Sequence, residues 1–338
     1  MKTNISVLKS STFRQLDSLS MKMLLFISII TCSCVLVPGG SAKGQLKSRK
    51  PVLTKLPFAL SADGRTPMEN TPVLFNSQML LVANYRPVAE KDSYLYLFDL
   101  QSGKEIARFG TSHSFASAYV LNNELNVFAL DFSATGKVWE PTGIDRFVTT
   151  DLKTWKTEKI MIPEGGEHLF NTSVCKDEKG YLMAYESDKP VQFCFRFARS
   201  TDLSKWERIP GITFLGEHHE YSACPVIRYH KPYYYVIYLH APLEGHNGWI
   251  SYMARSKNLE NWELSPYNPI LEAGAGEGSN NSDVDLMEYQ GKTYLYYATG
   301  DQATWGTVRV AMYDGPETEF FEKHFPPNLP AIKISSKQ

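Results

Sequence analysis

Residue types that can do acid–base or ligand-binding chemistry recur in short segments along this chain of 338 residues. Four carboxylates, Glu69, Glu167, Glu220 and Asp283, each lie close to the start of a strand-like run. A positioned carboxyl group can act as a general acid or base when its surroundings bring its pKa near the working pH. Six of the eight histidines lie in similar segments or after the following strand: His113, His168, His218, His219, His240 and His246. Solvation alone would favour Lys and Glu, so His, Asp, Asn and Trp together predict a site for a neutral polyhydroxylated ligand.

A repeat indicates which elements must position these side chains. Three segments share the pattern Thr/Ser-x-Asp/Asn-Leu-x-x-Trp and cover residues 149–155, 200–206 and 256–262. Their tryptophans are 51 and 56 residues apart. A period near 50 residues built from β-rich segments is typical of a propeller blade. We expect each copy to form the turn and outer strand of a blade, with its Trp packed between blades.

A second repeat precedes the strand pairs and gives five blade starts. The clearest copies cover residues 70–73, 171–174 and 281–284, and looser copies cover 115–120 and 221–226. Runs of β-branched and aromatic residues with polar–Gly turns follow these starts, and no extended stretch of helical period appears after residue 50. The sequence therefore predicts an all-β fold: a five-bladed β-propeller of four-stranded antiparallel blades around a central funnel.

The pattern also sets domain bounds. We expect one propeller domain over residues 56–330, a linker at 43–55 and a tail at 331–338. A closed ring needs an end segment to join a sheet, near 51–60 or 325–334, and the sequence leaves both open.

The N-terminal segment has the order of an export signal. A lysine follows Met21, and an apolar run covers residues 24–37 before a group of small residues. This run is short for a bilayer span and has the length of a signal-peptide core. We expect residues 1–42 to be a signal peptide, with Met21 as an alternative start, and the protein to be secreted or periplasmic. A lipid anchor through Cys32 or Cys34 is the less favoured alternative.

Composition excludes several classes of partner. The net charge is −1, without basic or acidic blocks, so we expect no nucleic-acid partner and no membrane span. Neither His-x-His nor His-Glu-x-x-His occurs, so we expect no catalytic metal and no required cofactor, while a structural calcium ion in the funnel stays open. Cys175, Cys194 and Cys224 form no disulfide framework and are expected to be small buried apolar residues. The oligomeric state is open.

In an up-and-down blade, the loop before strand 1 and the loop after strand 2 open on the same face. This geometry gives a set of predicted substrate-binding residues: Arg86, His113, His168, Asn171, His219, Trp249, Asn281 and Trp305. For Asn171 and Asn281 a structural role at a turn is an alternative.

Three stretches carry a resemblance to a known family. Residues 173–182, 202–206 and 223–238 resemble blades of the five-bladed propeller glycosidases of glycoside hydrolase family 43. The anhydro-galactosidases of family 117 are more distant relatives of the same kind. The resemblance covers about residues 60–325 and is more specific for the fold than for the substrate.

The resemblance implies an exported glycoside hydrolase that cleaves a plant or algal poly- or oligosaccharide. The long loop at 240–250 could block one end of a groove, which favours exo action. Trp249 and Trp305 are then expected to stack on a sugar ring, and His168 and His219 to donate to hydroxyls or act as the acid. The alternatives are a non-catalytic carbohydrate-binding propeller and a glycoside phosphorylase, for which only Arg86 and nearby histidines could bind phosphate.

At the catalytic positions, this chain differs from the family pattern. The family usually places three carboxylates at strand-1 starts, where this chain has Thr71, Asn171 and Ala223, and only Asp283 keeps a carboxylate. Inverting hydrolysis needs one protonated and one ionised carboxyl group about 6.5–9.5 Å apart. We predict Asp283 as the base and Glu220 as the acid, its pKa raised by an apolar wall near Tyr221. Glu69 and Glu167 are the next catalytic candidates.

Overall fold

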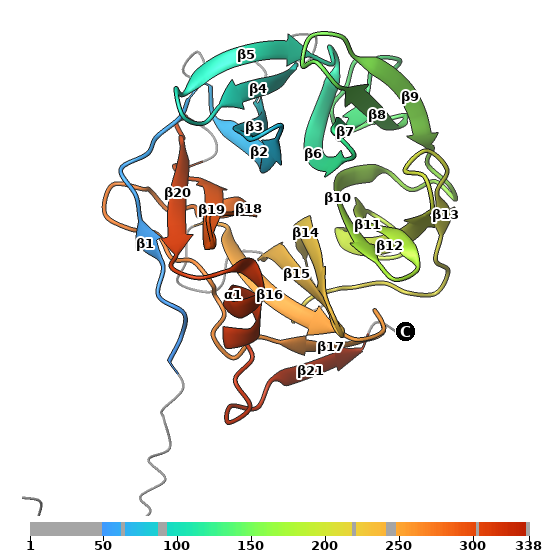
Figure 1. Ribbon diagram of the computed structural model, residues 1–338. Coiled ribbons are helices and arrows are strands. Elements are labelled where there is room, and N and C mark those ends of the chain that lie inside the picture. Colours follow the sequence, from blue (N-terminus) through green and yellow to red (C-terminus); the bar gives the residue numbers. More distant parts are fainter. Residues whose placement is uncertain are drawn as a thin grey trace, which may run out of the picture. The chain divides into compact units, whose positions relative to one another are not determined.

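Each of the five predicted strand pairs forms the inner half of a separate antiparallel sheet. The computed structural model describes residues 49–335, except 62–64, 87–92, 218–220, 241–247 and 302–303. In Figure 1 the five sheets stand around a common axis, with the first strand of each blade innermost. The predicted five-bladed propeller is confirmed.

The first three blades are built in simple chain order. Blade 1 contains β2 (Pro67–Phe75), β3 (Gln78–Tyr85), β4 (Leu95–Asp99) and β5 (Lys104–Phe109). Blade 2 contains β6 (His113–Leu121), β7 (Glu124–Asp131), β8 (Gly143–Thr149) and β9 (Lys156–Met161). Blade 3 contains β10 (Leu169–Asp177), β11 (Gly180–Ser187), β12 (Cys194–Ser200) and β13 (Glu207–Arg208).

The last two blades take in the chain ends. Blade 4 contains β14 (Ser222–His230), β15 (Tyr233–His240), β16 (Ile250–Ser256), β17 (Asn261–Leu264) and β21 (Ile332–Ser335). Blade 5 contains β18 (Ser282–Tyr289), β19 (Lys292–Ala298), β20 (Val308–Tyr313) and β1 (Thr54–Lys55). A short helix, α1 (Glu317–Lys323), buries Phe320 and Phe321, although the sequence showed no extended helical pattern.

Ring closure uses the N-terminal side. Thr54 pairs with Met312 and Lys55 with Ala311, so β1 is the outer strand of blade 5. The C-terminal strand β21 instead adds a fifth strand to blade 4 through β17. The sheets therefore extend beyond the expected bounds of 56–330, because part of the expected linker and part of the expected tail pair with blades.

The Leu-x-x-Trp repeat is a structured turn between the third and fourth strands. The Thr149 hydroxyl accepts a hydrogen bond from the Leu152 amide at 2.9 Å. Ser200 and Ser256 accept the same bond from Leu203 and Leu259. All three leucines have φ between 62° and 67°. The hydroxyl and the Asp or Asn of the motif therefore hold a backbone turn that would otherwise favour glycine.

The tryptophan of each copy packs against an aromatic ring of the preceding blade. Trp155 stacks on Phe109 with 3.7 Å between ring centroids. Trp206 meets Phe128 edge-on, and the buried Trp262 lies against Phe197. The prediction that these residues pack between blades is confirmed.

Five apolar clusters fill the interfaces between neighbouring blades. One cluster joins blades 1 and 2, and the others join each following pair, including blades 5 and 1. Because each blade buries both faces, its inner strands read as nearly continuous apolar runs. This packing holds the inner ends of strand 1 and strand 2 in fixed positions around the axis.

A two-residue bulge interrupts strand 1 in every blade. Pairing with strand 2 shifts register at 67–70, 114–117, 169–172, 223–226 and 282–285. A bulge places an extra residue opposite one partner and redirects side chains. The five bulges lie at equivalent depth, so they form a ring around the funnel.

Among the residues with a described structure, no helix has the length and apolar character needed to cross a membrane. The expected signal peptide at residues 1–42 lies outside the described residues.

Candidate active site in the propeller funnel

The bulge ring supplies the central residues of the site. The equivalent first bulge positions hold Met68, Phe115, Phe170, Cys224 and Asp283. Phe115, Cys224 and Asp283 have φ between 51° and 54°, a left-handed conformation that is uncommon for residues with a Cβ. Such backbone strain is held by the surrounding sheet and gathers at functional sites.

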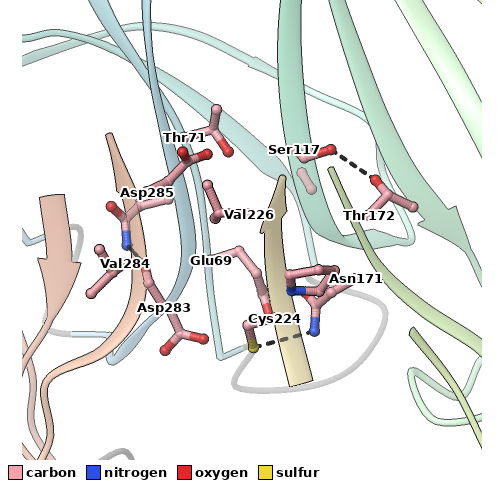
Figure 2. Close-up of a pocket in the computed structure, with 13 residues that line it drawn as sticks. Glu69, Thr71, Ser117, Asn171, Thr172, Cys224, Val226, Asp283, Val284 and Asp285 are labelled. Carbon is pink, nitrogen blue, oxygen red and sulfur yellow. Dashed lines mark hydrogen bonds between the residues drawn. The ribbon is translucent and has the colours of Figure 1, made fainter. Parts of the chain in front are cut away.

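Two adjoining cavities lie on the axis. The outer cavity has a volume of about 150 Å³ and the inner one about 20 Å³. They share four lining residues, Glu69, Asn171, Cys224 and Asp283. These four residues come from blades 1, 3, 4 and 5, and Figure 2 shows them gathered at one point of the pocket.

Glu69 and Asp283 form a close carboxylate pair. Their nearest oxygens and the Cys224 Sγ all lie within 4.8 Å of one another. Both residues are 8 % exposed. Burial, and next the Asp283 carboxylate, raise the pKa of Glu69 to about 8. The Ser282 hydroxyl donates to Asp283 Oδ2 at 2.6 Å, which favours the charged form of Asp283.

Glu186 is a third buried carboxylate at the same cavity. Its Oε2 accepts hydrogen bonds of 3.0 Å from Asn171 Nδ2 and from the Cys224 amide. Burial raises the pKa of Glu186 to about 7, against the effect of these two bonds. Because both bonds go to Oε2, a proton on this group sits on Oε1. Blade 3 borders neither blade 1 nor blade 5, so Glu186 faces the Glu69–Asp283 pair across the axis.

Glu186 is absent from the candidates that the sequence pattern predicts. Its position, next to last in strand 2, corresponds to Asn84 in blade 1. Asn84 Oδ1 likewise accepts the amide of Ala116 in the next blade, at 3.2 Å. Aligning the second strands of the repeats by this position would have singled out the only acidic side chain there among the five blades.

Aromatic side chains form the wall of the outer cavity. Tyr221 lies 4.9 Å from Trp249 and 4.9 Å from Phe193, measured between ring centroids. Phe115 and Trp139 line the cavity as well. An apolar aromatic wall with a few convergent polar groups is typical of a pocket for a small organic ligand.

Five sequence-predicted residues line the outer cavity: Glu69, Arg86, Asn171, Trp249 and Asp283. Asn171 also orients Glu186, so its structural and ligand-binding roles coexist. Glu220 and His219 lie outside the described residues.

Glu167 is not part of the funnel site, which corrects its place among the catalytic candidates. Its side chain is fully buried and pairs with Arg196 at 2.6 Å and Arg208 at 2.9 Å. The Ser187 hydroxyl donates to the same carboxylate at 2.9 Å. These contacts tie β12 and β13 to the start of blade 3, a structural role. A substrate could reach Glu167 only by breaking two buried ion pairs.

The two described histidine candidates have partners away from the cavity lining. His113 Nε2 lies 3.1 Å from Asp145 Oδ2, and Nδ1 lies 2.9 Å from the Thr111 carbonyl oxygen. His168 Nδ1 lies 2.8 Å from Asp188 Oδ2. Both rings therefore hold local structure in blades 2 and 3, which differs from the predicted substrate contact.

Asn281 and Trp305 also differ from prediction. Asn281 is fully buried, and its Nδ2 donates to the Asn280 carbonyl oxygen at 2.7 Å. Trp305 is 43 % exposed but is not among the residues that line the two described funnel cavities. The structural alternative therefore holds for Asn281.

Two clusters of possible metal ligands occur among the described residues. One is Glu69, Cys224 and Asp283, and the other is His113, Asp131 and Asp145. Calcium prefers six to eight oxygen ligands, so the buried thiol of the first cluster suits it poorly. In the second cluster, Lys159 Nζ lies 2.8 Å from both Asp131 and Asp145 and already supplies the positive charge. Neither cluster fits the structural calcium ion considered above.

The fold and the funnel together define a five-bladed propeller with carboxylates around an axial pocket, and comparison with solved structures supports the fold. The catalytic domain of the family 62 α-L-arabinofuranosidase from Coprinopsis cinerea is 8 % identical, with a TM-score of 0.59. That match covers 78 % of this chain and 97 % of the other. A thermostable family 43 glycoside hydrolase is 14 % identical with a TM-score of 0.58, over 84 % and 97 % of the two chains.

A third neighbour is a β-1,2-mannobiose phosphorylase from Listeria innocua in complex with β-1,2-mannobiose. It is 15 % identical with a TM-score of 0.55, over 81 % of this chain and 96 % of the other. No family model and no curated protein matches at the level of sequence. At these identities the comparisons establish the shared fold, the one expected from the resemblance to propeller glycosidases.

Proposed function

We propose that the protein is a glycoside hydrolase that acts on a neutral carbohydrate in the propeller funnel. The observation that carries this proposal is the convergence of Glu69, Glu186 and Asp283 on one cavity, with two of the three pKa values raised toward neutrality. Carboxyl groups held in opposite protonation states are what acid–base cleavage of a glycosidic bond requires. The solved neighbours, two of them glycosidases, support the same class of activity.

The geometry suggests a role for each carboxyl group. Asp283 is the general base, as the sequence predicted, and its Oδ2 accepts a hydrogen bond from the Ser282 hydroxyl, which favours the charged form. Glu186 is the general acid, because it faces Asp283 from the far side of the ring and its pKa is raised to about 7. Glu69 holds a proton beside Asp283, so the close pair carries one negative charge in place of two.

The shape of the pocket supports exo action. The inner cavity has room for only one or two water molecules. A chain cannot thread past it, so a terminal sugar enters from the outer cavity. Export remains part of this proposal, and mass spectrometry of the mature protein should find its N-terminus at Lys43, after cleavage at Ala42.

Activity should be measured on a panel of plant and algal glycans and aryl glycosides, with and without inorganic phosphate. We expect hydrolysis that is independent of phosphate and is lowered about 10²–10⁴-fold in both Asp283→Asn and Glu186→Gln. Glu167→Gln, outside the funnel, provides a folded control only where it retains structure by circular dichroism. Glu220→Gln tests the rival acid: a loss there, with Glu186→Gln active, would transfer the acid role to Glu220.

Two outcomes would replace the proposal. Product formation that requires phosphate would make the protein a phosphorylase, the activity of one solved neighbour. Among the described residues that line the outer cavity, Arg86 is the only Lys, Arg or His, which disfavours phosphorolysis. Binding of a glycan without any turnover would make the protein a non-catalytic carbohydrate-binding propeller.

A further inference from the structure

Trp139 is a large, solvent-exposed apolar side chain at the mouth of the funnel. It lines the outer cavity and is 51 % exposed. Its loop, between β7 and β8, is fixed by internal bonds. Thr135 Oγ1 donates to the Glu140 carbonyl oxygen at 2.9 Å, and the Gly136 amide donates to the Phe132 carbonyl oxygen at 2.8 Å. Because Trp139 lines the outer cavity and its loop is held in place, its ring is available for contact with a ligand in that cavity.

The ring of Trp139 packs on the wall of the cavity. Its centroid lies 5.5 Å from Phe115 and 6.0 Å from Phe170, in tilted arrangements. Phe115 and Phe170 occupy bulge positions equivalent to that of Asp283. The same ring of bulges therefore positions the catalytic carboxylate and the support of Trp139.

The exposed fractions of the lining residues distinguish a closed inner end of the cavity from an open outer end. Glu186 is 2 % exposed, against 51 % for Trp139. Glu69 and Asp283 also line the inner cavity, whereas Trp139 and Arg86 line only the outer one. A terminal sugar at the carboxylates would therefore leave its neighbour in the chain at Trp139.

We propose that Trp139 forms a second sugar subsite, which binds the ring on the leaving-group side of the bond that is cleaved. This inference rests on the proposed function and adds the recognition of at least a disaccharide. The face of an aromatic ring has negative potential and attracts the weakly positive C–H groups of a sugar face. Arg86, exposed at the same mouth, offers N–H donors to hydroxyl groups of that ring. The ligand class is a neutral sugar ring with an open C–H face.

The test compares two substrates with the same terminal sugar. One is the best neutral oligosaccharide from the glycan panel, and the other is the glycosyl fluoride, whose leaving group cannot reach Trp139. For Trp139→Ala we expect kcat/KM on the oligosaccharide to fall about tenfold, mainly through KM. On the fluoride we expect a change of less than about threefold. Trp139→Phe should recover most of the oligosaccharide activity, since it keeps an aromatic face.

Ile162→Ala serves as a control, because Ile162 is 58 % exposed and lies outside the funnel cavities. This variant should leave kcat/KM unchanged on both substrates. Equal losses on both substrates for Trp139→Ala, or no loss on either, would overturn the subsite. If the wild-type protein hydrolyses nothing, the proposed function fails by itself. Binding of the oligosaccharide panel to wild type and Trp139→Ala, by calorimetry, then decides the subsite: equal affinity for both proteins rejects it.

Discussion

Replacing Glu69 by Gln should stabilise the protein at alkaline pH and leave its stability nearly unchanged at acidic pH. The pKa of Glu69 is raised from an ordinary 4.5 to about 8, first by burial and then by Asp283. Between these two pH values the folded state keeps a proton that the unfolded chain has released. The free energy of unfolding therefore falls as pH rises from about 4.5 through about 8. Gln has the shape of the protonated acid and carries no such cost.

The size of the effect follows from the same shift. At 1.36 kcal/mol for each pKa unit, a rise from 4.5 to about 8 corresponds to at most about 5 kcal/mol. Sharing of the proton with Asp283 and entry of water reduce this, so we expect a gain of about 2 kcal/mol at pH 8.5. For a chain of this size, that gain raises Tm by roughly 5 °C. At pH 5.5 both folded proteins hold a neutral side chain, and the gain should shrink to less than about 1 kcal/mol.

Thermal unfolding of both proteins at the two pH values provides the assay. Glu167→Gln is the matched control, since it removes the buried carboxylate that pairs with two partly buried arginines. It should lower stability by about 3 kcal/mol at either pH. If Glu69→Gln lowers Tm at pH 8.5 as much as at pH 5.5, Glu69 is ionised and paired in the folded protein. The assignment of a proton to Glu69 would then be wrong.

Two further predictions concern the fold. Trp262→Ala should destabilise the protein by about 3–5 kcal/mol in chemical unfolding, because the buried ring fills the interface between blades 3 and 4. Trp155→Ala should cost less stability, because Trp155 is more exposed. A similar loss of stability in both variants would show that burial of the tryptophan does not determine how much it contributes to stability. Leu56→Pro should lower the free energy of unfolding by about 2 kcal/mol. It removes the amide beside β1 that donates to the Val310 carbonyl oxygen at 3.0 Å. An unchanged Tm would mean that this segment does not close the ring.

The sequence was sufficient for the fold because the repeat encodes local structure. A hydroxyl, an Asp or Asn, a Leu and a Trp at fixed spacing determine the same turn in three blades. Counting these turns and the strand starts gave the number of blades. The bounds of the domain were less accurate, because the pairing of β1 and β21 depends on partners far along the chain.

The candidate site was only partly predictable. Glu69 and Asp283 lie in the bulges at the start of the first strand of their blades. The repeat predicts that this end of the strand opens on the funnel face. Glu186 was missed because its orientation depends on Asn171 and on the Cys224 amide of the next blade. The Cys224 amide is placed by packing between blades 3 and 4, which no single repeat contains.

Glu167 illustrates the opposite error. Its place before blade 3 resembles that of the other candidates, but Arg196 and Arg208 reach it from β12 and β13. The pairing of those strands brings the two arginines to one carboxylate. A sequence pattern shows that a carboxylate is near a strand start and does not show which charges surround it.

The pairing of β1 with β20 has a consequence for how the protein is made. The first and the last parts of the propeller meet in one sheet, with Thr54 opposite Met312. During synthesis, blades 1 to 3 and the first four strands of blade 4 can form before this partner for β1 exists. The contact of β1 with β20 therefore closes a loop of most of the propeller, a step whose entropy makes it slow. Until β20 has been synthesised, the edge that later receives β1 is missing, and the unfinished ring presents apolar blade faces to chaperones or to aggregation.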